Sequence, residues 1–370
     1  MLTEVAPPQS NELEISIFGP GRGECVLIHL GNNDWCVVDS CIARGSNAPV
    51  ALEYLDGFRN DALQNIRLVV ATHWHDDHIG GLAALLSRAP NAAFSCSMAL
   101  ECPEFQTLIS AAPQNIAGRS GVEEFAAILR ELEARGKRAP IFAIQNRQIL
   151  SLAGAGRPFP ITLESLSPSD RSVRVALTEI GALIPRPGEP QRRIVNRSPN
   201  HTSAVIWVAA GPVRVLLGAD LEHSTRTDQG WTAVLTCHRD NIGAQLFKVP
   251  HHGSRNGDND TVWQQMMQPN PIAVITPFAG GSVRLPKISD CQRLLGRTKN
   301  LYCTAFGLGK PPVRDRLVDR MMKEQISDRQ ILSGKPGHVR VRWPVGDQVL
   351  GPSIETFNGA YQVTRDNSEG

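Results

Sequence analysis

The densest group of metal-binding side chains lies in the segment His73-Trp74-His75-Asp76-Asp77-His78. This HxHxDH pattern places three imidazoles and a carboxylate within six residues of a chain that has only 10 histidines in 370 residues. Imidazole and carboxylate groups bind divalent metals such as zinc, and sites with open positions use them to activate water. On a turn between a strand and a helix, His73 and His75 can face one metal while Asp77 and His78 face a second. The competing interpretation, a solvated polar turn, does not explain this local density of histidine.

Further candidate ligands follow other predicted strands. Asp39 follows the apolar segment 35–38, Asp220 follows the segment 213–217, and the pair His251-His252 follows the segment 245–249. In α/β sheets, ligands gather in the crevice outside the carboxyl ends of the strands. The positions of these residues therefore favour a single site at one edge of the sheets.

Apolar runs and amphipathic periodicity predict the elements that position these residues. Strands are expected at 13–18, 25–30, 35–38, 67–71, 161–166, 204–209, 213–217, 245–249, 272–276 and 301–304, and helices at 49–59, 82–87, 122–135, 173–184 and 289–297. The glycine-rich segment 19–23 resembles a phosphate-binding loop, but no GK[ST] follows it and the next element is a strand. We interpret it as a tight turn.

Taken in order along the chain, these motifs resemble those of the metallo-β-lactamase superfamily of dinuclear metallohydrolases. The HxHxDH segment is preceded by Thr and followed by Gly-Gly, as in that family. The other matching motifs are Val37–Ser40, His201-Thr202, Leu217–Asp220 and Val249–Ser254. The resemblance covers roughly residues 12 to 305. It implies an α/β fold, an αββα sandwich of two mixed β-sheets flanked by helices.

The resemblance also implies two divalent metal ions, with zinc expected and manganese as the alternative. The expected ligands are His73, His75 and His201 for one metal and Asp77, His78 and His251 for the second, with Asp220 bridging the two. Asp39 is expected to lie behind an imidazole and to fix its tautomer. The expected nucleophile is a bridging hydroxide, because metal binding lowers the pKa of water to about 7.

Two of these assignments have alternatives. His201 can instead be a plain surface imidazole. His251 is favoured over His252 as a ligand because Gly253-Ser254 follows it as in the family's HxGT/S pattern. His252 then serves as a general acid or contacts a phosphate. The expected catalytic residues are Asp77, Asp220 and His252.

The string Phe247–Ser254 resembles more specifically the soluble hydrolase domain of ComEC-type competence proteins and their stand-alone relatives. The segments Asn200–Ser203 and Tyr302–Gly307 agree with this resemblance. The chain departs from it in having no fused membrane channel and in carrying His201 inside the Asn-x-x-Ser segment. The resemblance favours hydrolysis of a phosphodiester in nucleic acid or a nucleotide, but we do not extend it to DNA uptake.

The charge distribution gives a second argument about the substrate. The net charge is +2, but residues 284–342 hold 14 Lys and Arg against 5 Asp and Glu, a local +9 that leaves −7 for the rest. Such a basic segment can attract a polyanion such as nucleic acid, or it can be an ordinary solvated surface. Candidate substrate contacts are Ser254 and three arginines of a Pro/Arg-rich loop, Arg192, Arg193 and Arg197. That loop is either a phosphate clamp or a flexible surface loop.

The domain organisation predicted from these motifs is one large hydrolase domain, residues 12–307, with an insertion at about 96–195. A basic C-terminal extension, residues 308–370, is expected to pack on the domain and to end in disordered residues. Two alternative functions stay open. One is hydrolysis of a small carbonyl substrate (a lactone, thioester or β-lactam) in an apolar pocket lined by Trp74 and Phe278. The other is a metal-bearing subunit with little turnover that binds a protein partner through the insertion or the extension.

The composition excludes several protein classes. With 41% hydrophobic and 20% charged residues, the chain is typical of a globular protein rather than a disordered one. The first residues lack the basic and apolar regions of a signal peptide, and no apolar run is long enough to span a membrane. The 8 cysteines include no CxxC pair. We therefore expect a cytoplasmic protein with free thiols and no membrane contact.

Overall fold

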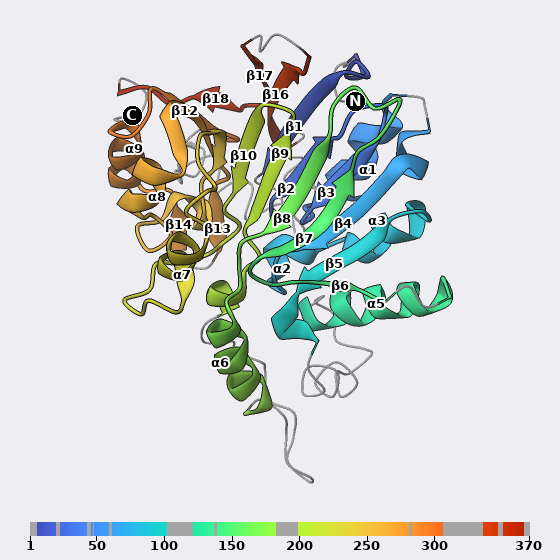
Figure 1. Cartoon of the computed structure of the whole chain (residues 1–370), viewed down its shortest axis with the longest axis horizontal. Coiled ribbons are helices and arrows are strands. Elements are labelled where there is room, and N and C mark those ends of the chain that lie inside the picture. The colour runs from blue at the N-terminus through green and yellow to red at the C-terminus, as the bar shows by residue number, and fades with distance from the viewer. Residues whose placement is uncertain are drawn as a thin grey trace, which may run out of the picture.

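The fold is seen in a computed structural model of the chain (Figure 1). The structure describes residues 6–19, 23–42, 46, 48–58, 61–101, 121–136, 139–182, 199–280, 283–305, 336–346 and 351–365. The whole segment 306–335 and the residues 366–370 therefore lie outside the described residues, as do the candidate substrate contacts Arg192, Arg193 and Arg197.

Two mixed sheets of eight strands each form the centre of the described structure. The first sheet has the order β17-β16-β1-β2-β3-β4-β5-β6. Its strands are β1 (Glu12–Gly19), β2 (Cys25–His29), β3 (Trp35–Val38), β4 (Ile66–Ala71), β5 (Ala93–Ser97), β6 (Ile141–Ala143), β16 (Gly337–Pro344) and β17 (Ser353–Phe357).

The second sheet has the order β18-β15-β12-β11-β10-β9-β8-β7. Its strands are β7 (Arg147–Leu152), β8 (Ile161–Ser165), β9 (Ile206–Ala210), β10 (Val213–Leu217), β11 (Ala244–Lys248), β12 (Met267–Ile275), β15 (Asn300–Cys303) and β18 (Tyr361–Gln362). A separate hairpin is formed by β13 (Phe278–Gly280) and β14 (Val283–Leu285).

Helices cover the outer faces of the two sheets. The α-helices are α1 (Val50–Asp56), α2 (Asp76–Ile79), α3 (Leu82–Arg88), α5 (Gly121–Ala134), α6 (Asp170–Gly181), α7 (Gly230–Cys237), α8 (Asp260–Gln265) and α9 (Ile288–Leu295). Short 3-10 turns are η1 (Ala62–Asn65), η2 (Met98–Leu100), η3 (Pro199–Thr202) and η4 (His251–Gly253). Figure 1 shows α1, α3 and α5 on one side of the sheets and α7, α8 and α9 on the other. No helix within the described ranges combines the length and apolarity needed to cross a membrane.

Alternating side chains of the strands build three apolar layers. In β1, Ile15 and Ile17 point into the core between the two sheets, whereas Phe18 packs with α1 on the outer face. Successive strand side chains point to opposite faces, so a strand buried on both faces can serve two cores. The third core lies between the second sheet and α7, α8 and α9, with Trp231 and Phe247 among its members. The result is the predicted αββα sandwich.

Parallel pairing brings the carboxyl ends of several strands to one edge. In the first sheet β3, β4, β5 and β6 run parallel, and in the second sheet β10, β11, β12 and β15 do so. Asp39 follows β3, the HxHxDH segment follows β4, Asp220 follows β10 and His251 follows β11. The strand ends therefore position the candidate site, as the sequence predicts.

Two segments contribute more strands than the sequence predicts. The segment 96–195, expected as an insertion, supplies the predicted strand β8 and also β6 and β7, and all three pair with strands of the two sheets. Within the segment 308–370, β16 pairs with β1 over eight residue pairs and β18 pairs with β15. Both segments thus contribute strands to the sandwich. The domain boundaries themselves stay a prediction.

The buried His29 at the end of β2 is expected to make folding stability sensitive to acid. Its Nδ1 lies 2.8 Å from the Glu12 carbonyl oxygen, and the Asn33 backbone N–H donates to its Nε2 at 3.1 Å. A neutral ring satisfies both contacts, and burial lowers the pKa of His29 from 6.5 to about 4. Between these two pH values the unfolded chain binds a proton that the folded chain does not. Stability should therefore fall as the pH drops through this window, by up to about 3 kcal/mol from this residue.

Urea unfolding of the wild type and of His29→Gln at several values between pH 7 and pH 4.5 measures this effect. The variant should start from a lower free energy of unfolding at pH 7 but lose less of it on acidification. Equal slopes in the two proteins would contradict the assignment of this acid sensitivity to His29.

Candidate metal centre

The HxHxDH segment forms the turn between β4 and α2. The His78 backbone N–H donates to the His75 carbonyl oxygen at 3.0 Å, which closes the first turn of α2 immediately after His75. His73 and His78 are fully buried, although both are polar. Buried polar side chains require partners, so the question is which groups face these imidazoles.

One group of possible ligand atoms combines His73, His75 and Asp220, whose nitrogen and oxygen atoms lie within 4.8 Å of one another. His73 Nε2 and His75 Nδ1 are 3.0 Å apart. Burial lowers the pKa of His73 well below its usual value, and the neighbouring His78 and His75 add to that shift. His73 is therefore neutral at physiological pH, which is the form that binds a metal.

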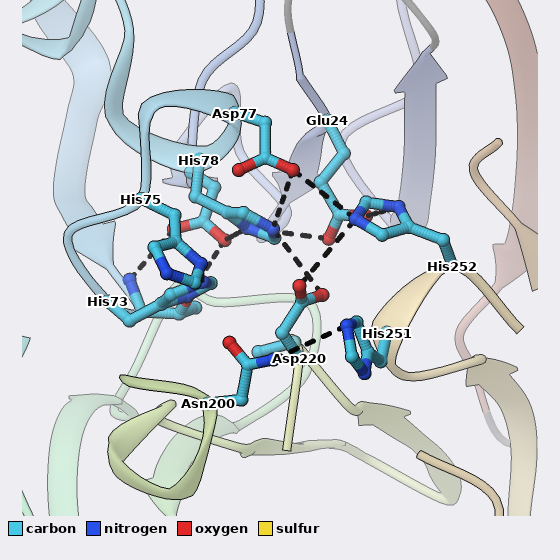
Figure 2. Close-up of polar contacts among 12 residues, drawn as sticks. Glu24, His73, His75, Asp77, His78, Asn200, Asp220, His251 and His252 are labelled. Atoms are coloured by element: carbon cyan, nitrogen blue, oxygen red, sulfur yellow. Dashed lines mark hydrogen bonds and ion pairs between the residues drawn. The ribbon is translucent and has the colours of Figure 1, made fainter. Parts of the chain in front are cut away.

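A second group surrounds the other face of Asp220. His78 Nε2 lies 3.4 Å from Asp220 Oδ1, and His252 Nε2 lies 3.6 Å from Asp220 Oδ2. His252 Nε2 is also 3.3 Å from Asp77 Oδ2. Figure 2 shows the side chains of Asp77, His78 and His252 converging on Asp220, with His73 and His75 on the other side of this carboxylate. Asp220 thus belongs to both groups.

Hydrogen bonds fix the orientation of the two imidazoles in the second group. His78 Nδ1 lies 2.7 Å from Asp39 Oδ2, and Asp39 is itself held by the Thr72 backbone N–H and hydroxyl at 2.8 and 2.7 Å. His252 Nδ1 lies 2.9 Å from the Thr276 carbonyl oxygen. With Nδ1 occupied by an acceptor, Nε2 is the nitrogen of each ring that faces the site and that can bind a metal in place of a proton.

A buried ion pair lies behind these imidazoles. Lys248 Nζ is 2.5 Å from Glu24 Oε1 and donates to the Ala219 carbonyl oxygen at 3.2 Å. Glu24 also accepts a hydrogen bond from the Thr276 hydroxyl. Its carboxylate is 3.8 Å from Nδ1 of His78 and 3.8 Å from Nδ1 of His252. Glu24 can be grouped with the candidate ligands, but it approaches the imidazoles from the side that carries their orienting hydrogen bonds.

The electrostatics of this centre fit divalent metal ions. Burial by itself would lower the pKa of His78, yet the carboxylates of Asp220, Glu24, Asp39 and Asp77 raise it well above its usual value. The same excess of negative charge raises the pKa of His252 against the effect of burial. His78 Nε2 and Asp220 Oδ1 are both buried and have no hydrogen-bond partner in the described part of the chain. Unpartnered ligand atoms in a negatively charged, histidine-containing pocket are what a zinc or manganese site requires.

Comparison with known proteins identifies the family. The sequence profile described as the metallo-beta-lactamase superfamily matches residues 18–275, more than half of the chain and all the candidate ligands. The chain belongs to this superfamily. No curated protein matches the sequence significantly.

Solved structures of this superfamily are similar at low sequence identity. The metallo-beta-lactamase fold protein YhfI from Bacillus subtilis has 13% identity and a TM-score of 0.31, with 64% of this chain and 69% of that chain covered. The Rm3 metallo-beta-lactamase has 14% identity and a TM-score of 0.31, with 68% and 82% covered. The profile match, rather than these likenesses, carries the family assignment.

In this superfamily member, His252 rather than His251 lies with the candidate ligands. The geometry therefore favours His252 as a ligand, whereas the HxGT/S pattern favours His251. Both residues adopt left-handed backbone conformations, with φ values of 48° and 54°. This backbone conformation is rare for residues other than glycine and persists only where the surroundings enforce it. The turn directs His252 to Asp77 and Asp220, whereas His251 faces Asn200 and Glu222.

The position of His201 also differs from the expectation. His201 lies in η3, but its ring nitrogens do not join the group formed by His73, His75 and Asp220. Its Nδ1 is buried and has no hydrogen-bond partner within the described ranges. The role of His201 as a ligand therefore stays a prediction.

Other candidate residues have structural partners within the chain. The Ser254 hydroxyl donates to the Asn256 side-chain oxygen, and Ser254 is buried. Trp74 belongs to the outer core of the first sheet rather than to a pocket wall. Phe278 stacks on His252 with ring centroids 5.1 Å apart and therefore borders the centre.

Three polar residues of the centre were not assigned a role from the sequence. Glu24 precedes β2, Lys248 ends the apolar strand β11, and Asn200 lies in η3. A lysine at the end of an otherwise apolar strand was a usable signal, because a buried ammonium needs a carboxylate partner. The glycine at position 23, directly before Glu24, has a structural reason that only the fold reveals. A Cβ on Gly23 would lie 1.9 Å from the Asp77 carbonyl oxygen.

Proposed function

We propose that the chain is a dinuclear metal-dependent phosphodiesterase that acts on nucleic acid or a nucleotide. The observation that carries this proposal is the position of Asp220 in both groups of ligand atoms. A carboxylate shared in this way would hold two metal ions next to each other. Paired metals about 3.5–4 Å apart stabilise the attacking and the leaving oxygens of a phosphoryl displacement.

The geometry assigns some residues of the centre to metal binding and others to orienting the ligands. When bound, the metal ions polarise the phosphoryl group and lower the pKa of water. His73, His75, Asp77, His78, His252 and Asp220 would hold them. Asp39 and the Thr276 carbonyl keep His78 and His252 in the tautomer that presents Nε2. Burial of His73, His78, His252 and Asp220 keeps bulk water away from these side chains.

The choice of a phosphodiester rests on sequence resemblance more than on the described surface. The resemblance of Phe247–Ser254 to the ComEC-type hydrolase domain supports it. The local basic segment supports it less, because four of its described arginines have carboxylate partners inside the chain. Arg293 contacts Asp258 at 2.7 Å and Asp290 at 2.5 Å, and Arg297 pairs with Asp260. Arg340 and Arg342 pair with Glu355 and Glu14. Arg284, Lys287 and Lys299 remain exposed and can attract a polyanion.

One observation favours the alternative of a small carbonyl substrate. The Phe278 ring on His252 places an apolar surface at the border of the centre. An ester, thioester or β-lactam substrate with an apolar group can pack against such a ring. Both functions need the same metals, so only the substrate separates them.

A substrate panel tests the proposal. Purified protein, with its metal content measured, is incubated with bis-p-nitrophenyl phosphate, single-stranded DNA, RNA and cyclic nucleotides, and in parallel with a lactone, a thioester and a β-lactam. We expect turnover of the phosphodiesters and loss of that turnover in Asp220→Asn. Hydrolysis restricted to the carbonyl substrates would replace the proposed function by its alternative. Metal binding without turnover of any substrate would overturn both.

A further inference from the structure

The side-chain amide of Asn200 makes polar contacts through its nitrogen but not through its oxygen in the described structure. Its Nδ2 donates to Glu222 Oε1 at 2.8 Å and contacts His251 Nε2 at 3.3 Å. Its Oδ1 is buried and has no hydrogen-bond partner among the residues that the structure describes. A buried carbonyl oxygen without a partner is costly, so this atom is expected to meet a group that the described residues do not supply.

Glu222 determines which way the amide faces. An amide nitrogen can donate two hydrogen bonds and its oxygen can donate none. The Glu222 carboxylate requires a donor, so turning the amide over would lose the 2.8 Å contact, whereas the His251 nitrogen can donate or accept according to its tautomer. The orientation of Oδ1 therefore follows from the hydrogen-bond network and not from the coordinates alone.

The segment that carries Asn200 is fixed against the HxHxDH turn. The Ala204 backbone N–H donates to the carbonyl oxygen of Thr72, the residue before His73, at 3.0 Å, and the Ser203 N–H donates to the Asn200 carbonyl oxygen at 3.1 Å. Figure 2 shows the Asn200 nitrogen directed at His251 and the amide oxygen on the opposite side, toward the part of the view that holds His73 and His75. The group formed by His73, His75 and Asp220 has no fourth ligand among the described His, Cys, Asp and Glu residues.

We propose that Asn200 Oδ1 is the remaining protein ligand of the metal ion held by His73, His75 and Asp220. This inference rests on the proposed metal-dependent function. It assigns a role to the first histidine of the His251-His252 pair, because His251, together with Glu222, orients the ligating amide. Groups that orient a ligand in this way typically contribute 10–100-fold to metal affinity.

The assignment makes the two metal positions chemically different. Each position has two imidazoles and two oxygen ligands, but the position near His73 and His75 has the neutral amide of Asn200 where the position near His78 and His252 has the carboxylate of Asp77. A neutral oxygen attracts a divalent cation less strongly than a carboxylate does. The Asn200 position is therefore expected to bind divalent metals less tightly than the other position.

Metal titration of the full chain tests the inference without any substrate. Metal-depleted protein is titrated with Co²⁺, followed by visible absorption, and with Zn²⁺ in competition with a chelator. Asn200→Ala should weaken one of the two binding events at least tenfold and leave the other within twofold. Asn200→Asp, which keeps an oxygen ligand, should retain both events. Glu222→Gln should weaken the same event as Asn200→Ala, by a smaller factor.

The rival ligand is His201, whose Nδ1 is also buried without a partner. His201→Gln is expected to leave both binding events within twofold of the wild type. Loss of one event in His201→Gln, or unchanged binding in Asn200→Ala, would overturn the assignment, as would Asn200→Asp behaving like Asn200→Ala. Circular dichroism and thermal unfolding of the metal-depleted variants establish that each is folded. Failure of the proposed hydrolysis would appear separately, as metal binding without turnover in the substrate panel.

Discussion

Replacing His252 with alanine is expected to abolish activity and to weaken binding of one metal by at least about 100-fold. Removing a residue that merely orients a ligand already costs 10–100-fold, and His252 presents its own Nε2 to the centre. That nitrogen lies 3.3 Å from Asp77 Oδ2 and 3.6 Å from Asp220 Oδ2. Equilibrium Zn²⁺ competition and turnover of bis-p-nitrophenyl phosphate measure the two effects.

The matched control is His251→Ala, a change of the same kind one residue earlier. His251 contacts Asn200 and Glu222 rather than Asp77 and Asp220. Its loss should therefore weaken metal binding by roughly tenfold, the lower end of the range for an orienting residue. A larger loss in His251→Ala than in His252→Ala would restore the ligand assignment suggested by the HxGT/S pattern.

The two histidines show which part of the site could not be predicted from the sequence. The HxHxDH segment could be read directly, because its ligands are close in sequence and follow a strand whose apolar pattern is clear. The choice between His251 and His252 depends on two successive left-handed residues, and no local pattern announces that backbone conformation. Only the surrounding contacts, such as the Arg293 hydrogen bond to the Gly253 carbonyl oxygen at 2.7 Å, define the turn.

Long-range pairing limited the prediction in the same way. The strands 13–18, 25–30 and 35–38 were predicted from local apolar patterns and are confirmed as β1, β2 and β3. The strand β16 was missed, although it pairs with β1 along its whole length. Its alternating His338, Arg340 and Arg342 read as a basic surface, yet all three are buried, and Arg342 Nε lies 2.7 Å from Glu14 Oε2. A charged side chain is rarely buried without a partner, so its burial can be predicted only when that partner can be identified. The partner of Arg342 lies more than 300 residues away in the sequence.

Breaking the buried pair of Lys248 and Glu24 is expected to give the largest loss of stability in the described part of the chain. Both side chains are almost fully buried, and the pair joins the residue preceding β2 in the first sheet to the end of β11 in the second. Lys248→Met leaves the Glu24 carboxylate without its cation, and Glu24→Gln leaves the ammonium without its anion. Each single change should lower the free energy of unfolding by about 3–5 kcal/mol, as found when one partner of a buried pair is removed.

The double variant Glu24→Gln/Lys248→Met separates the pair from the individual side chains. It contains no uncompensated buried charge, so its loss of stability should be smaller than the sum of the two single losses by more than 1 kcal/mol or so. Urea unfolding of metal-depleted protein measures all four members of the cycle without a contribution from bound metal. Additive losses would mean that each residue acts through other contacts, such as those of Lys248 with the Ala219 carbonyl and of Glu24 with Thr276. A strong coupling would show instead that this pair holds the two sheets together at the edge where the metal ligands converge.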